Sequence, residues 1–309
     1  MVCIRSYRYV LQSRGRGTPT GGCYRTVVFP RRSTDISGVF QTNCLTEVMF
    51  PEAITRAKFL DEYQATHGTV IGPLHGLPFS LKDHFITPPY PTSIGIALLA
   101  NLPRDPSTET MFVTIMRDLG AIPYVKTNVP TAMMMMETKN NIWGEARNPL
   151  QKEMSPGGSS GGECALVAMR GSPLGFGTEI GGSLRHPAAW NHLYALKPSC
   201  GRFPLWGLQD RPVSILLLAI IGPVARSLST IRLFSETLLS EKVAPWTLDP
   251  TCVPIPWRRN VIQPKGRKLR FGIIGNSDGV VTCHPPVERA LGIVRGCLEN
   301  AGHEVFDWY

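Results

Sequence analysis

Hydrophobic and polar residues follow helical and extended periods along most of the chain. The segment 51–66 predicts a helix, because a proline occupies its first turn and four apolar residues share one stripe. Those residues are Ala53, Ile54, Ala57 and Leu60. Further helices are predicted at 107–119, 160–170, 228–240 and 285–302. Short strands are predicted at 121–127, 174–179, 269–274 and 303–308, and a turn that runs into a strand at 76–83.

The final third of the chain predicts a strand, a helix and a second strand in direct succession, at 269–274, 285–302 and 303–308. Two strands joined by a helix lie parallel in one sheet, with the helix on its face. The order of the elements therefore predicts an α/β fold with a sheet that is at least partly parallel.

The longest apolar run extends from Val213 to Ala225 and is interrupted by Ser214, Gly222 and Pro223. Spanning a bilayer takes roughly 20 apolar residues. We therefore expect a buried strand and turn in this segment, and no membrane span.

The formal net charge of +9 is concentrated at the N-terminus. Residues 1–34 hold seven arginines and no acidic residue, so the rest of the chain carries only +2. A basic, acid-free leader is typical of a mitochondrial transit peptide, a disordered tail or an incorrect gene start. A nucleic-acid-binding function would depend on this leader alone, and we expect no nucleic-acid partner.

The cysteines and histidines indicate neither disulfides nor a metal site. The eight cysteines are scattered and form no C-x-x-C pair, which is typical of reduced, buried thiols in a reducing compartment. We therefore expect a cytoplasmic protein, with the mitochondrion as the alternative that the leader suggests. No H-x-x-x-H pair occurs, and His186 and His192 lack a nearby carboxylate. The sequence predicts no cofactor.

Two clusters of glycine and serine indicate where the chemistry lies: GGSSGG at 157–162 and GGS at 181–183. Glycine loses much conformational entropy on folding, so a dense cluster indicates that the backbone must approach a partner closely. The first cluster lacks the G-K-[ST] ending of a phosphate-binding loop, and no G-x-G-x-x-G follows a strand. Nucleotide binding is therefore not predicted.

Ser183 has the setting of a nucleophile. The two glycines before it would allow consecutive backbone N–H groups to form an oxyanion hole beside its hydroxyl. A serine hydroxyl needs a base, and no His-Asp pair is evident. Lys82 could serve if it is buried, because burial lowers a lysine pKa by up to roughly 3–5 units. Considered alone, however, a lysine among apolar residues is more often a surface residue whose stem packs on the protein.

An ordered series of motifs resembles successive landmarks of the amidase signature family. The motifs are GPLHGLPFSLKD, YVKTNVP, NIWGEARNP, SPGGSSGGE, GSPLGFGTEIGGSLRHPAA and LKPSCGRFP. The likeness runs from about Asn43 to the end of the chain, and ARSLSTIRLF and PWTLDPTCVPIPWR are most similar to acetamidase-like general amidases of fungal type. The resemblance implies a mixed, largely parallel β-sheet core flanked by helices, incomplete in this chain.

The resemblance also implies a Ser-cisSer-Lys triad. Ser183 matches the nucleophile, Ser159 the bridging serine whose peptide bond is cis, and Lys82 the base. The implied reaction hydrolyses a small-molecule carboxylic acid amide to an acid and ammonia or an amine, through an acyl-enzyme.

Further site residues follow from the same resemblance. It assigns the oxyanion hole to the backbone N–H groups of Ile180, Gly181, Gly182 and Ser183. Ser160 is either a helix cap or a supporting hydrogen-bond donor, and Arg185 is expected to orient the loop. The run Met133, Met134, Met135 and Met136 is equally consistent with packing in the core and with an apolar wall of the acyl pocket.

This chain departs from the family pattern at several positions. Glu179 replaces the usual aspartate, His192 and Ala195 replace glycines, and family members continue well beyond residue 309. We therefore expect a leader at 1–40 and a partial amidase signature domain at 41–309. The chemical alternative is a truncated, catalytically inactive amidase-like protein, for which weak or absent hydrolysis is expected. A subunit of an amidotransferase complex is less favoured, and a homodimer is left open.

Overall fold

The computed structural model describes residues 42–209, 219–258, 268–275 and 280–308. The basic leader expected at 1–40 lies outside these residues. The chain divides after Trp257 into two compact units. No described helix combines the length and apolar character that a membrane span requires.

The first unit is built on a six-stranded sheet with the order β1-β3-β2-β6-β8-β7. Its strands are β1 (Leu45–Val48), β2 (Pro78–Lys82), β3 (Ile122–Thr127), β6 (Gly175–Glu179), β7 (Tyr194–Ala195) and β8 (Ile220–Ala225). The three strands β3, β2 and β6 run parallel, whereas β1, β8 and β7 join antiparallel. The predicted mixed α/β sheet with parallel central strands is thus confirmed.

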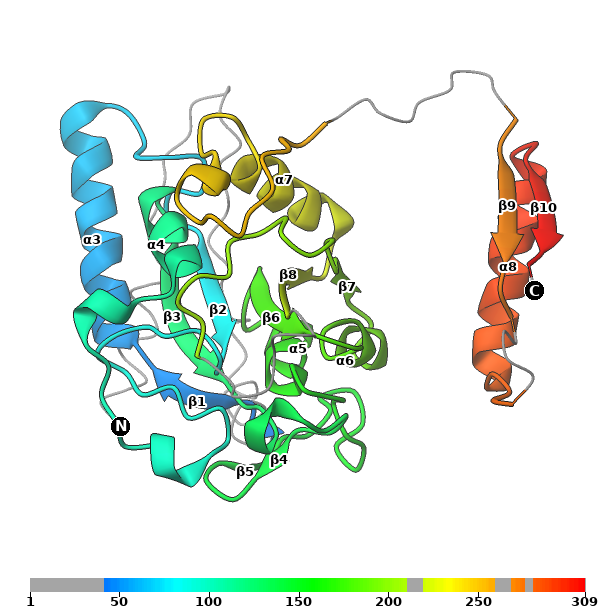
Figure 1. Ribbon diagram of the computed structural model, residues 1–309, viewed down its shortest axis with the longest axis horizontal. Coiled ribbons are helices and arrows are strands. Elements are labelled where there is room, and N and C mark those ends of the chain that lie inside the picture. Colours follow the sequence, from blue (N-terminus) through cyan, green and yellow to red (C-terminus); the bar gives the residue numbers. More distant parts are fainter. Residues whose placement is uncertain (1–41, 210–218, 259–267, 276–279, 309) are drawn as a thin grey trace. The chain divides into compact units, whose positions relative to one another are not determined.

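Helices cover both faces of this sheet (Figure 1). They are α3 (Phe50–His67), α4 (Met111–Asp118), α5 (Gly161–Ala168), α6 (Arg185–Trp190) and α7 (Leu228–Leu238). On one face, α4 and α7 enclose an aromatic core in which Phe112 and Phe234 each place their ring centroids 4.7 Å from that of Phe176 on β6. On the other face, α3 and α5 pack against β3.

The alternation of side chains along β2 divides its residues between these two faces. Successive side chains of a strand point to opposite sides of a sheet. Phe79 and Leu81 accordingly enter the aromatic core. Ser80 and Lys82 face the side of α5, where their hydrogen-bond partners Glu163 and Ser159 lie. The strand therefore contributes both to the core and to the polar centre of the unit.

The second unit contains β9 (Arg270–Ile273), α8 (Pro285–Asn300) and β10 (Glu304–Asp307). β9 and β10 pair in parallel, with Phe271 opposite Val305. The strand–helix–strand unit predicted from the sequence is confirmed.

Several elements differ from the sequence prediction. The helix expected at 107–119 begins only at Met111, because Pro106–Thr108 forms a separate 3₁₀ turn that the Asp105 side chain caps. The strand expected within 213–225 is β8, and residues 210–218 of that run lie outside the described part. The prediction missed β1, β7, α6, and the short hairpin of β4 (Lys139–Asn140) and β5 (Gly144–Glu145).

Candidate active site

Lys82 ends β2 and points into the protein. Its side chain is completely buried, and its Nζ donates hydrogen bonds to Ser159 Oγ at 2.8 Å and to the Thr178 carbonyl oxygen at 3.1 Å. The surface alternative considered from the sequence is therefore wrong for this lysine. Burial disfavours the charged ammonium form, so this setting suits an amine that accepts a proton.

Ser159 lies in the first glycine cluster, between β5 and α5. The Gly158–Ser159 peptide bond is cis, as the resemblance implied. A Cβ at Gly158 would lie 2.7 Å from the Met135 carbonyl oxygen and 2.8 Å from the Glu137 backbone. Glycine is required here because the segment beside the serine packs directly against another backbone.

The second glycine cluster lies directly beside the first. The Ser160 backbone N–H donates to the Ser183 carbonyl oxygen at 3.0 Å, and Ser183 is half-buried. Among the described contacts, hydrogen bonds join Lys82 to Ser159 but none joins the Ser183 hydroxyl to Ser159. The fold thus brings the three residues into one region and connects two of them directly.

Ser160 occupies the N-cap position of α5 but does not cap it with its side chain. Its hydroxyl instead lies 3.4 Å from the Thr178 carbonyl oxygen, which also accepts from Lys82. A Cβ at Gly177 would lie 2.6 Å from Ser160 Oγ, so the glycine makes room for this serine against β6. The geometry favours the supporting hydrogen-bond role over the helix-cap role.

Glu179 organises the loop that carries Ser183. Its buried carboxylate accepts from the backbone N–H groups of Gly182 (2.7 Å), Arg185 (3.1 Å) and Leu184 (3.2 Å), and from Arg185 Nε at 2.9 Å. Burial would raise the pKa of Glu179, but the bonds from the Arg185 side chain and the three amides outweigh it and lower that pKa to about 2. Glu179 is therefore ionised at neutral pH.

These contacts bear on the predicted oxyanion hole. The Gly182 N–H is directed at Glu179 and not toward an open space. Gly181 is exposed, and a Cβ there would meet no atom within 4 Å. Of the four amides that the resemblance assigns to an oxyanion hole, the one of Gly182 thus donates to a carboxylate of the protein itself.

The methionine run divides between core and surface. Met133 is buried with Ile94 and Val129, whereas Met134, Met135 and Met136 are exposed. Within this run, the terminal methyl group of Met136 is 3.3 Å from where a Cβ at Gly182 would lie. Met136 therefore approaches the second glycine cluster, whereas Met133 packs in the core.

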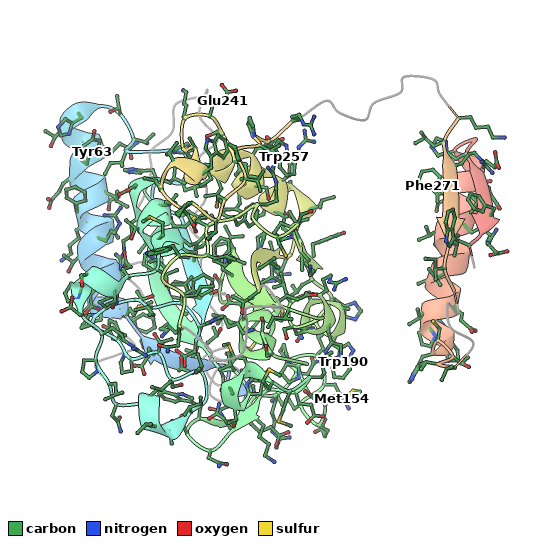
Figure 2. All side chains as sticks on the ribbon, viewed as in Figure 1. Tyr63, Met154, Trp190, Glu241, Trp257 and Phe271 are labelled. Carbon is green, nitrogen blue, oxygen red and sulfur yellow. The ribbon has the colours of Figure 1, made fainter. Side chains whose placement is uncertain are left out.

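Further apolar side chains lie near this loop at the end of α6. Trp190 and Met154, both labelled in Figure 2, are exposed. Asn148 connects their backbones, since its side-chain amide donates to the Trp190 carbonyl and its N–H to the Met154 carbonyl. The His186 ring packs edge-on against the Trp190 ring, with 4.1 Å between the ring centroids. Trp190 thus ends the helix that begins two residues after Ser183.

The sequence reasoning also missed a buried carboxyl group. Glu163, in the first turn of α5, accepts hydrogen bonds from Ser80 and from Thr127. An acidic residue at this position is ordinarily explained by the helix dipole, so the sequence alone gave no reason to place it in the site. No group of three or more potential metal-ligating side chains occurs among the described residues.

Comparisons with known proteins identify the family of this chain. Residues 39–309 match the family described as Amidase. "Amidase 1" of Gibberella moniliformis is 43% identical over 272 residues, which cover 87% of this chain and 51% of that protein. An "Acetamidase" of Aspergillus oryzae is 42% identical, covering 86% of this chain and 49% of that protein.

Solved structures that resemble this chain are also amide-hydrolysing enzymes by their names. A fatty acid amide hydrolase superposes with a TM-score of 0.81 at 34% identity, covering 88% of this chain and 47% of that one. A bacterial aryl acylamidase of the amidase signature enzymes superposes with a TM-score of 0.75 at 25% identity, covering 89% of this chain and 56% of that one. The chain spans about half the length of the curated relatives it matches. By sequence and by fold, it belongs to the amidase signature family.

Proposed function

We propose that this protein hydrolyses a carboxylic acid amide to an acid and ammonia or an amine, with Ser183 as nucleophile, Ser159 as bridging serine and Lys82 as base. The observation that carries the proposal is the 2.8 Å contact between the buried Lys82 amine and Ser159 Oγ. The backbone bond between Ser160 and Ser183 supports it, because it holds the nucleophile segment beside the bridging serine.

The reaction begins with two proton transfers. Neutral Lys82 accepts the proton of Ser159 Oγ, which in turn accepts that of Ser183 Oγ. The Ser183 oxygen then attacks the amide carbonyl carbon and forms a tetrahedral intermediate. Catalytic hydrogen bonds are often long without substrate, so the Ser183 hydroxyl would complete this chain once an amide is bound.

Collapse of the intermediate breaks the carbon–nitrogen bond. Ser159 returns a proton to the leaving nitrogen, which departs as ammonia or an amine and leaves Ser183 acylated. Water then attacks the ester along the same proton path and releases the acid. The backbone N–H groups of Ile180, Gly181 and Ser183 would stabilise the oxyanion, and losing one such donor typically costs about 2.7–4 kcal/mol of barrier.

Arg185 and Glu179 would hold these donors in position and would not touch the substrate. Glu179 binds three amides of the loop, and Arg185 contacts its carboxylate. Exposed methionines, Met134, Met135 and Met136, would offer an apolar and adaptable wall to the acyl group. We propose a small-molecule amide as substrate, in agreement with the names of the acetamidase and amidase relatives.

A reducing compartment such as the cytoplasm is part of the proposal. Six described cysteines are free: Cys44, Cys164, Cys200, Cys252, Cys283 and Cys297. Disulfides are rare where glutathione keeps thiols reduced. The homodimer stays a prediction, which light scattering of the purified chain would decide.

The test is labelling with a serine-directed fluorophosphonate, followed by mass spectrometry of the modified peptide. We expect the label on Ser183, its absence from Ser183→Ala, and strong loss in Lys82→Met. Trp257→Phe, far along the chain from the triad residues, is the control and should label as the parent does. A folded parent that takes no label would contradict the proposal and favour the inactive amidase-like alternative.

A further inference from the structure

Glu163 is a completely buried carboxyl group for which the proposed reaction gives no role. Its Oε1 accepts a hydrogen bond from the Ser80 hydroxyl, and its Oε2 accepts one from Thr127 Oγ1 at 2.7 Å. Ser80 belongs to β2 and Thr127 to β3. One side chain of α5 therefore connects the helix to β2 and β3, two of the three parallel strands.

β2 carries the proposed base, and β3 lies beside it in the sheet. Lys82 is two residues beyond Ser80 on the same face of β2, and it pairs in register with Thr127 on β3. Ser159 is four residues before Glu163, immediately ahead of α5. The Glu163 side chain thus holds the helix start that carries Ser159 against the strand end that carries Lys82.

Two glycines allow close packing around Glu163 and the first turn of α5. A Cβ at Gly175 of β6 would lie 2.1 Å from Glu163 Oε1, so the glycine provides the space that the carboxyl group occupies. At the neighbouring position, a Cβ at Gly162 would lie 2.5 Å from the backbone of Asn128. The first turn of α5 is fixed against β3 and β6 by these close approaches.

Glu163 also interacts with Lys82 through charge. Burial raises its pKa to about 7, although the bonds from Ser80 and Thr127 and the positive charge of Lys82 lower it in part. The other titratable groups nearby are the thiols of Cys44 and Cys164, whose pKa values burial raises, so both remain neutral. Among these groups, Lys82 is the one whose positive charge favours the ionised form of Glu163.

We propose that Glu163 is a positioning residue for the Lys82–Ser159 pair, which it holds through Ser80 and Thr127 and whose lysine charge it controls. The reasoning about catalysis rests on the proposed amidase function. An ionised Glu163 favours the ammonium form of Lys82, which cannot accept a proton. A protonated Glu163 removes that counter-charge and so disfavours the ammonium form of Lys82.

The first experiment measures the rate of fluorophosphonate labelling at Ser183 between pH 5 and 10. Glu163→Gln keeps the size of the side chain and can keep both hydroxyl contacts, but it removes the charge. The pH range in which the labelling rate rises should then move down by about one unit. Within that range, the variant should label about tenfold faster than the parent at the same pH. Glu62→Gln, an exposed change on α3, is the matched control and should leave the profile in place.

The second experiment does not depend on activity. The pH dependence of urea unfolding is compared for the parent, Glu163→Gln, Lys82→Met and the double variant. The charge of Lys82 lowers the pKa of Glu163. Removing the lysine should therefore move the pH range in which Glu163 changes the unfolding free energy to higher pH, by about one unit. Thr127→Val, which removes one donor to the carboxylate, should move it in the same direction and serves if Lys82→Met does not fold.

The outcomes distinguish a failure of the proposed amidase function from a failure of the proposed role of Glu163. An unlabelled parent would refute the proposed function, while the unfolding cycle would still decide whether the two charges are coupled. If Glu163→Gln slows labelling equally at every pH, or the cycle gives no coupling, Glu163 is only a scaffold residue and the inference is overturned. Shifts in both experiments support it.

Discussion

The carboxylate of Glu179 should contribute several kcal/mol to the free energy of unfolding, because it accepts hydrogen bonds from backbone N–H groups of the loop that carries Ser183. In Glu179→Gln, an NH₂ group replaces one accepting oxygen and would face backbone N–H donors, which leaves hydrogen bonds unmade. The charge that Arg185 contacts is also lost. We expect the variant to keep the fold of the sheet and to lose stability through this loop.

The magnitude follows from the pKa. The pKa of Glu179 is lowered from 4.5 to about 2, because the Arg185 side chain and three amides outweigh the effect of burial. A shift of about 2.5 units corresponds to about 3 kcal/mol. Since the folded-state pKa is the lower one, this stability is present above pH 4.5 and is lost as the pH falls from 4.5 toward 2.

Urea unfolding of the parent and of Glu179→Gln would test this magnitude between pH 3 and pH 7. The difference in unfolding free energy should be about 3 kcal/mol at pH 7 and should shrink as the pH falls below 4.5. Glu145→Gln is the control, because its contact with Arg147 is exposed and 3.8 Å long, and such pairs contribute less than about 1 kcal/mol. A constant difference across this pH range, or one below about 1 kcal/mol at pH 7, would refute the reasoning.

Three further changes have definite expected results. Gly158→Ala would place a methyl group 2.7 Å from the Met135 carbonyl oxygen and should cost about 1–3 kcal/mol of unfolding free energy; an unchanged melting temperature would contradict this close approach. Phe176→Ala should cost about 3–5 kcal/mol in urea unfolding, because the ring is central to the aromatic core, and a loss below 1 kcal/mol would be inconsistent with that packing. Lys82→Met keeps the bulk but removes the proposed base, so Ser183 labelling should fall by a factor of about 100 or more, and a rate equal to that of the parent would exclude Lys82 as the base.

The sequence predicted the long elements well because their patterns are strong and local. α3, α7, α8 and the parallel pair of β9 and β10 each have a clear helical or extended period. β7 has only two residues, and α6 begins two residues after Ser183. Pairing with β8 and packing under the glycine loop define these two elements, and neither interaction leaves a period in the sequence.

The site was predictable to a similar extent. The motifs that carry Lys82 and Ser159 allowed the two residues to be named, and the fold brings them into contact. The orientation of Lys82 could not be derived from its apolar neighbours, because it depends on which face of β2 meets α5. The involvement of the Gly182 amide with Glu179 and the approach of Met136 depend on loop geometry that spacing does not encode.

The alternation along β2 has a consequence for how this strand tolerates change. An insertion or deletion of a single residue between Gly76 and Lys82 would exchange the two faces of the strand that follows it. Lys82 would then enter the aromatic core, and Leu81 would replace it beside Ser159. A lysine without partners in such a core is very costly, so a slipped strand would be rejected during folding and would not persist as an inactive protein. The residue proposed as the base therefore also makes the alignment of the central strand unambiguous.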